Sequence, residues 1–164
     1  MVVDTQARLV QGEALLAPLS SAITRPEPNR IDFALEPEQL YMAVDLLING
    51  KWGYLVAITG LDHGPEAGRM EALYHFGSYG AVITLRIQIK RTQPCVPTIC
   101  SLIPSATFYE RELMEMFGVI VEGTPNTDYL YLPEGWPSGV YPLRKDWEPV
   151  NPLLVPVQEA KHEQ

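Results

Sequence analysis

The feature that most limits how this chain can fold is a run of prolines near its C-terminus. Between Pro125 and Pro156 a proline recurs every few residues. Proline fixes φ and lacks a backbone N–H, so neither a helix nor the interior of a sheet can continue through such a segment. The sequence therefore predicts a folded domain that ends before this run and an extended arm that follows it.

The last regular element before the arm is expected to be a helix. The stretch Glu110–Gly118 reads Glu-Arg-Glu-Leu-Met-Glu-Met-Phe-Gly, and a glycine directly after helical residues commonly ends a helix. Ser105 is the expected N-cap, since its hydroxyl can accept a hydrogen bond from backbone amides two or three residues on. Helical spacing places Leu113, Met116 and Phe117 on one side, which predicts that this side packs on the domain.

Strand and helix signals upstream predict one α+β domain. Ile83, Leu85, Ile87 and Ile89 alternate with polar residues, as in a strand with one wet face. A helix is expected from Pro37 to the stop signal at 49–50. The fold predicted is a mixed four-stranded sheet with helices packed on one face, followed by an extended arm rich in proline and aromatic residues. The expected strands are residues 31–35, 53–59, 70–76 and 83–90.

Three regions follow from these signals. Residues 1–30 are expected to hold a short N-terminal helix, which Gly12 and Pro18 interrupt, and a linker. Residues 31–118 form the α/β core domain, which ends in the helix described above. Residues 119–164 form the C-terminal arm, which we expect to dock on a partner.

Composition excludes several classes of function. The chain has 164 residues and a net charge of −8, with no basic run, which argues against nucleic-acid binding. It has no apolar stretch long enough to span a bilayer and no secretory signal pattern, so we expect a cytoplasmic protein that reaches a membrane only through a partner. Cys95 and Cys100 are too few to hold a cluster or zinc ion alone and are expected to be free thiols.

No catalytic or metal-binding constellation is evident. Glu110, Glu112 and Glu115 resemble an acidic cluster, but no histidine stands at ligand spacing beside them. A solvated or partner-facing charged surface is the preferred interpretation. The sequence also lacks a glycine-rich phosphate loop and a nucleophile elbow, which argues against catalysis within this chain.

The arm carries several aromatic side chains whose exposure to water would be unfavourable. Burying an aromatic ring removes roughly 150–250 Å² from solvent, so these rings are expected to lie against protein. For 129–132, folding back on the chain's own sheet and docking on a partner are both open. Beyond Trp136 a partner's groove is expected, with Arg144, Lys145 and Asp146 as polar anchor. The aromatic residues are Tyr129, Tyr131, Trp136, Tyr141 and Trp147.

Three motifs in the same order resemble the signature of the 30 kDa subunit family of respiratory complex I and its relatives in membrane-bound [NiFe] hydrogenases. They are Glu-Arg-Glu-x-x-Glu-Met-Phe-Gly at 110–118, Leu-Pro-Glu-Gly-Trp at 132–136 and Pro-Leu-Arg-Lys-Asp at 142–146. The resemblance implies a cofactor-free subunit of the peripheral arm, on the cytoplasmic side of the membrane. It implies docking on the large subunit, which shapes the quinone site or holds the [NiFe] centre, beside a small Fe-S subunit and a ferredoxin-like Fe-S subunit.

The motifs also depart from many complex I members. Gly-Thr-Pro at 123–125 stands where those members have Gly-His-Pro, and more residues separate Trp136 from the Pro-Leu-Arg-Lys-Asp motif. Both differences favour the hydrogenase branch. In either branch the resemblance implies a structural subunit of an ion-translocating oxidoreductase, with electrons passing through Fe-S clusters of neighbouring chains.

The alternative hypothesis is a stand-alone α+β module that binds a protein and has no redox role. Under the subunit hypothesis no residue is catalytic and none binds metal. The residues expected to contact partner subunits are Glu110, Arg111, Glu112, Glu115, Trp136, Tyr141, Arg144, Lys145, Asp146 and Trp147.

Overall fold

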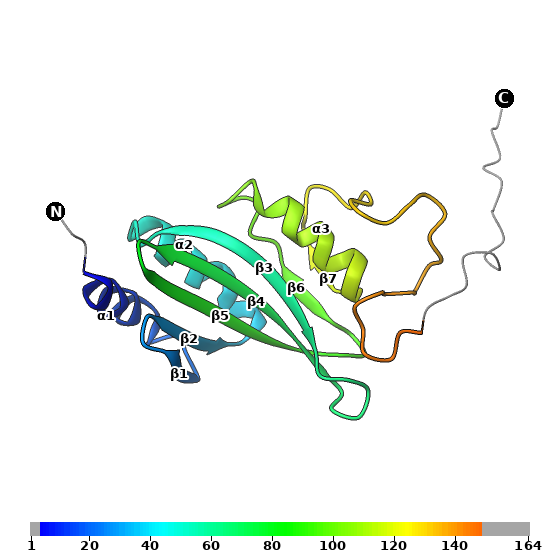
Figure 1. The fold of residues 1–164 in the computed structure, drawn as a ribbon. Coiled ribbons are helices and arrows are strands. Elements are labelled where there is room, and N and C mark those ends of the chain that lie inside the picture. The colour runs from blue at the N-terminus through cyan, green and yellow to red at the C-terminus, as the bar shows by residue number, and fades with distance from the viewer. Residues whose placement is uncertain (1–3, 149–164) are drawn as a thin grey trace.

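The computed structural model describes residues 4–148, and within them the chain forms an α+β fold with an extended C-terminal arm (Figure 1). The helices are α1 (Thr5–Leu16), α2 (Leu40–Asn49) and α3 (Ala106–Phe117), with a 3₁₀ turn, Pro37–Gln39, before α2. The strands are β1 (Ala22–Glu27), β2 (Arg30–Leu35), β3 (Tyr54–Asp62), β4 (Arg69–Ser78), β5 (Ala81–Lys90), β6 (Cys95–Pro97) and β7 (Ile120–Glu122).

The main sheet has five strands in the order β1-β2-β5-β4-β3. β2 and β5 are parallel, while the other neighbours are antiparallel, so the predicted mixed sheet is confirmed. The predicted count of four strands is wrong, because β1 comes from residues assigned to the N-terminal helix and linker. β1 is an edge strand that is exposed at nearly every position and contains Pro26. A strand of this kind lacks the alternation of apolar residues that reveals a half-buried strand.

The core lies between one face of the sheet and the helices. Ile83, Leu85 and Ile87 of β5 are fully buried on this face. α1 packs so closely that a Cβ on Gly12 would lie 2.3 Å from the Cδ1 atom of Ile83. Gly12 is therefore part of the helix rather than an interruption, because close packing requires it. α3 covers the β3 end of the same face, where the Phe117 ring lies against Gly60.

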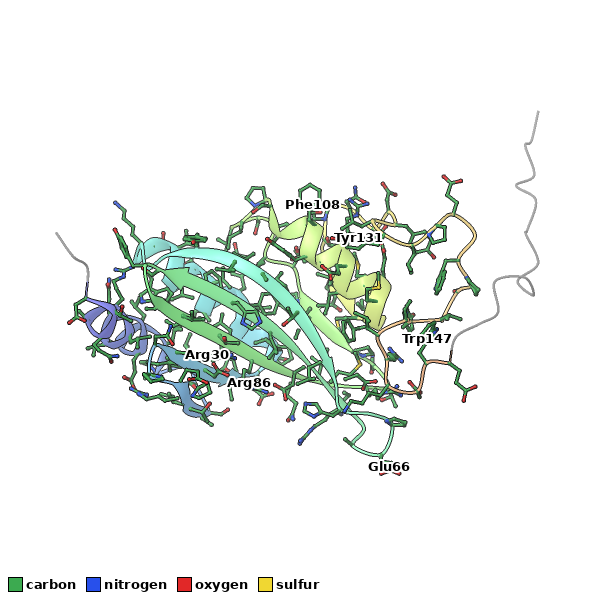
Figure 2. All side chains as sticks on the ribbon, in the orientation of Figure 1. Arg30, Glu66, Arg86, Phe108, Tyr131 and Trp147 are labelled. Atoms are coloured by element: carbon green, nitrogen blue, oxygen red, sulfur yellow. The ribbon has the colours of Figure 1, made fainter. Side chains whose placement is uncertain are left out.

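The opposite face of the sheet carries a ladder of charged side chains across β2, β5 and β4. Arg86 lies 3.3 Å from Asp32 and 2.6 Å from Glu71, and Arg30 lies 2.6 Å from Asp32. Asp32 is only 2% exposed and Glu71 8% exposed, because the arginine side chains cover them. Opposite charges across neighbouring strands stabilise this open face, and Figure 2 shows Arg30 and Arg86 on it.

A second, two-stranded parallel sheet pairs β6 with β7 and brackets α3. α3 ends at Gly118 in the left-handed conformation, with φ of 68°, as predicted. The expected N-cap is wrong in its chemistry: Ser105 has helical dihedrals and its side chain makes no capping hydrogen bond. Across residues 4–148, none of the helices combines the length and the apolar character that a bilayer crossing requires.

Candidate functional site

Helix α3 is the centre of the site, and Glu110 ties its first half to the preceding loop. Its carboxylate accepts hydrogen bonds from the Ile99 N–H at 2.9 Å, the Thr98 hydroxyl at 2.8 Å and the Cys100 thiol at 3.1 Å. Glu110 is completely buried. The expectation of a charged surface is therefore wrong for this residue, because neutral donors from 98–100 satisfy the carboxylate inside the protein.

Glu115 is the second buried carboxylate of α3, and it holds the arm. It is 6% exposed, and the charged-surface expectation is wrong here too. Its oxygens accept hydrogen bonds from three successive backbone N–H groups, those of Leu130, Tyr131 at 3.0 Å and Leu132 at 3.1 Å. The N–H groups of this extended segment have no neighbouring strand to bond, so the Glu115 carboxylate serves as their acceptor and fixes the position of the segment.

Arg111 binds the same part of the arm from the carbonyl side. Its guanidinium donates to the Asp128 carbonyl at 2.7 Å and to the Tyr129 carbonyl at 2.6 Å. Arg111 and Glu115, four residues apart on α3, therefore grip one stretch of backbone from both sides. The backbone of 129–132 therefore lies on helix α3 rather than on the sheet. The Tyr129 and Tyr131 side chains are exposed, so their docking on a partner stays a prediction. Glu112, between them, is half-buried and makes no side-chain hydrogen bond within residues 4–148.

The end of α3 receives the next part of the arm. A Cβ on Gly118 would lie 2.3 Å from the Tyr141 ring, so only glycine allows the ring to lie there. Arg144 stacks over that ring at 4.5 Å and donates to the Phe117 carbonyl at 2.7 Å. The Leu143 N–H donates to the Met116 carbonyl at 3.0 Å. These bonds satisfy carbonyls that a helix end leaves unpaired.

The last anchor of the arm lies at the end of β3. Asp62, 3% exposed, accepts hydrogen bonds from the Lys145 N–H at 2.9 Å and from Nε and Nη2 of Arg91 at 3.0 and 3.1 Å. Arg91 also bonds to Asp146. Burial alone would raise the pKa of Asp62, but the hydrogen bonds from Arg91, Lys145 and Gly64 outweigh it and lower the pKa to about 2.

The two tryptophans of the arm sit beside these anchors. The Trp136 indole N–H donates to the Val140 carbonyl at 2.8 Å. The Trp136 side chain lines a hollow of about 140 Å³ together with Arg111, Tyr129 and others. Trp147 is half-buried, and its indole N–H has no acceptor within residues 4–148.

We call this set of contacts the arm clasp, defined by Arg111, Glu115, Gly118, Asp62 and Arg91 with the segments that they hold, 128–132 and 141–146. It unites all three sequence motifs, which no residue pattern had predicted to touch. Asp62 and Arg91 were missed altogether, because their pairing joins the ends of two distant strands and leaves no local signal in the sequence.

Neither cysteine takes part in a disulfide. Burial raises the pKa of the Cys100 thiol, and the Glu110 carboxylate that accepts its hydrogen bond acts in the same direction. Across residues 4–148, His, Cys, Asp and Glu side chains do not gather in a group of three or more that could hold a metal ion.

Comparison with known families agrees with the motifs. The family model described as respiratory-chain NADH dehydrogenase, 30 Kd subunit, matches residues 33–152. This chain belongs to that family. The 30 kDa family match spans the main sheet from β2 onward, α3 and the arm clasp, so the domain and the arm fall within one family match rather than in two unrelated parts.

Relatives of this family member are named as parts of different enzymes. A NADH-quinone oxidoreductase subunit from Roseiflexus sp. (strain RS-1) is 31% identical over 141 residues, 82% of this chain and 80% of that protein. Formate hydrogenlyase subunit 5 of Escherichia coli (strain K12) is 32% identical over 121 residues, 72% of this chain but 21% of that protein. The matches cover between 54% and 80% of the length of the first four curated relatives.

A solved structure has the same fold. It is a chain of the membrane-bound sulfane sulfur reductase, described as an archaeal respiratory membrane complex, with a TM-score of 0.73 and 22% identity. The similarity covers 88% of this chain and 86% of that one. At this level of identity the comparison establishes the fold of the 30 kDa family member.

Proposed function

We propose that this chain is a cofactor-free structural subunit of a complex-I-like, ion-translocating respiratory oxidoreductase, peripheral to the membrane on its cytoplasmic side. In this proposal it docks on the large subunit, which shapes the quinone site or holds a [NiFe] centre. A small Fe-S subunit and a ferredoxin-like Fe-S subunit carry the electrons. The chain itself contributes position and contact surface, and no catalytic group.

The observation that carries the proposal is the exposed aromatic surface above the arm clasp. Phe108 on α3 is 56% exposed, and Tyr131 and Tyr129 on the arm are 64% and 49% exposed. Phe108 and Glu115 lie seven residues apart, on one side of α3, and Glu115 holds the backbone of Tyr131. Figure 2 shows Phe108 and Tyr131 along the same side of the molecule. Exposed aromatic clusters of this kind are typical of protein interfaces.

The clasp supports this role energetically. Because Arg111, Glu115 and Asp62 already hold the arm in place, its backbone entropy is lost on folding and not on binding. A pre-ordered arm therefore presents its aromatic side chains at a lower cost than a disordered tail would.

The relatives support a place within a larger assembly. In formate hydrogenlyase subunit 5 the matching segment is 21% of a longer protein, which fits a unit that works in contact with other protein. The named relatives include both a hydrogenlyase subunit and quinone oxidoreductase subunits, so they leave both branches of the proposal open.

The test is purification of the chain from its native membranes in mild detergent, with mass spectrometry of the co-purifying proteins and metal analysis. The proposal predicts a multi-subunit complex that contains iron. Nickel together with iron would select the hydrogenase branch, while iron with flavin and no nickel would select a quinone reductase. Recovery of the chain alone and free of metal would contradict the proposal and favour a stand-alone binding module.

A further inference from the structure

One end of the sheet concentrates cationic side chains in a protein whose net charge is −8. We call this group the basic rim, and its proximity follows from the backbone. Arg69 and Lys90 are cross-strand partners on β4 and β5. The Arg91 N–H donates to the Gly68 carbonyl at 3.0 Å, and the Lys145 N–H bonds to Asp62 at the end of β3. The members of the rim are Arg69, Lys90, Arg91, Arg144 and Lys145.

Most of these charges lack a counter-ion. Within residues 4–148, Arg91 forms ion pairs with Asp62 and Asp146, but the other rim residues form none. Arg69 and Lys90 stand directly opposite each other, an arrangement of like charges that destabilises a sheet. The chain therefore tolerates a local electrostatic cost at this end, and a bound anion would remove it.

Arg144 also has hydrogen-bond donors that are not used within residues 4–148. Its Nε donates to the Phe117 carbonyl, whereas no hydrogen bond within residues 4–148 involves its two terminal nitrogens. Stacking on Tyr141 fixes the plane of the guanidinium. An arginine held in this way can bind a carboxylate through both terminal nitrogens with little further loss of entropy.

A hollow of about 600 Å³ lies beside the rim, and of the rim residues Arg91 and Arg144 line it. Its lining includes Pro65, Arg91, Pro94, Ile120, Tyr141 and Arg144. Ile120 is 54% exposed, so the hollow offers apolar contact next to cationic groups. Figure 1 shows the arm passing close to the loop between β3 and β4. Pro65 and Gly68 of that loop line the hollow.

We propose that the basic rim and its hollow bind an acidic segment of a neighbouring subunit, with a carboxylate on Arg144 and an apolar side chain on Ile120. This inference rests on the proposed function and names the chemistry of one partner contact. A concave, partly apolar hollow fits a peptide better than a lipid surface. The net charge of −8 also opposes approach to anionic membranes and nucleic acids.

Zero-length carbodiimide cross-linking of the intact complex from native membranes tests this directly. The reagent joins an amine to a carboxylate only when the two are in contact. Lys90 and Lys145 should be joined to Asp or Glu residues of another subunit in the mass spectra. Lys51 is the control and should remain unlinked to any subunit, since it is exposed and precedes the start of β3, at the opposite end of that strand from Asp62.

Each other outcome overturns the inference. Links from Lys90 and Lys145 only to Glu159 or Glu163 would assign the hollow to the chain's own C-terminal residues. Unlinked lysines that are shielded from acetylation in membranes but not in detergent would assign it to lipid. Unlinked lysines that stay open to acetylation throughout would leave the rim free. If no other protein co-purifies with the chain, it is the proposed function that fails.

Single charge reversals give an independent readout. Lys90→Glu and Lys145→Glu each change the net charge by the same amount as Lys51→Glu. The side chains of these three lysines form no hydrogen bond or ion pair within residues 4–148. Either rim variant should be lost from the complex about tenfold more readily than wild type in a salt wash, because the new glutamate would repel the carboxylates of the acidic segment. The Lys51→Glu variant should be retained like wild type. Equal retention of all three variants would contradict the inference.

Discussion

At the scale of single residues, the two glutamates of α3 show how one helix can hold two segments. Glu110 binds the loop before the helix and Glu115 binds the arm after it. Both carboxylates are buried and satisfied by uncharged donors, which is the condition for keeping a carboxylate inside a protein. Two of the three residues that resemble an acidic cluster in the sequence, Glu110 and Glu115, are therefore bound to backbone of the same chain.

Replacing Glu115 with alanine should release the arm while the sheet stays folded. The N–H groups of 130–132 would lose their acceptor, and the free energy of unfolding should fall by about 2–3 kcal/mol. Hydrogen exchange at these amides should accelerate in the Glu115→Ala variant. Glu112→Ala is the matched control, since Glu112 makes no side-chain hydrogen bond within residues 4–148, and should change the unfolding free energy by less than about 0.5 kcal/mol. Unchanged exchange in Glu115→Ala would refute the clasp.

Gly118→Ala should lower the free energy of unfolding by more than its left-handed backbone conformation alone explains. A left-handed residue other than glycine costs about 1–2 kcal/mol, and a Cβ here would also displace Tyr141, which adds about 1 kcal/mol or more. Gly68→Ala is the matched control: its φ of 63° is close to the 68° of Gly118, but a Cβ there meets nothing within 4 Å. Denaturant unfolding of both variants measures the difference. Equal losses would mean that the Tyr141 ring does not pack on Gly118.

Asp62 should make the clasp sensitive to acid. Its pKa is about 2 in the folded protein and 3.8 without the fold, so its contribution is present above about pH 4 and is lost as the pH falls through 2. The free energy of unfolding of wild type should exceed that of Asp62→Asn by about 2 kcal/mol at neutral pH. That gap should shrink between pH 4 and pH 2. A gap that does not change with pH would show that Asp62 is not held by Arg91.

At the scale of elements, sequence patterns predicted those parts that rest on local signals. The structure has the elements that three such signals predict. These signals are the alternation in β5, the proline before α2 and the glycine after α3. β1 was missed because an exposed edge strand carries little hydrophobic pattern. The clasp could not be predicted either, since its contacts join α3, the end of β3 and the arm, and long-range pairing leaves no periodicity in the sequence.

The arm as an element should be separable from the sheet domain. Arg144→Ala removes the stacking on Tyr141 and the bond to the Phe117 carbonyl, both of which lie outside the main sheet. We expect this variant to loosen assembly with partner subunits, while circular dichroism reports cooperative unfolding of the domain as in wild type. Loss of cooperative unfolding would show that Arg144 belongs to the domain core.

At the scale of the whole molecule, the chain is a sheet with helices on one face and an arm bound to α3 and to the end of β3. The helices bury one face, and charged pairs cover the other. The aromatic side chains beside α3 and the basic rim are two of the surfaces that residues 4–148 leave exposed.

The most direct test of docking through α3 and the arm exchanges one exposed apolar side chain on α3 for a charge in the native organism. Phe108→Glu places a carboxylate in the aromatic surface, while Val10→Glu does the same on α1, where Val10 is 65% exposed. Both variants should fold, because neither side chain is buried. If α3 and the arm form the docking surface, the complex purified from membranes should lack the Phe108→Glu chain and retain the Val10→Glu chain. Equal retention of both would contradict docking through α3 and the arm.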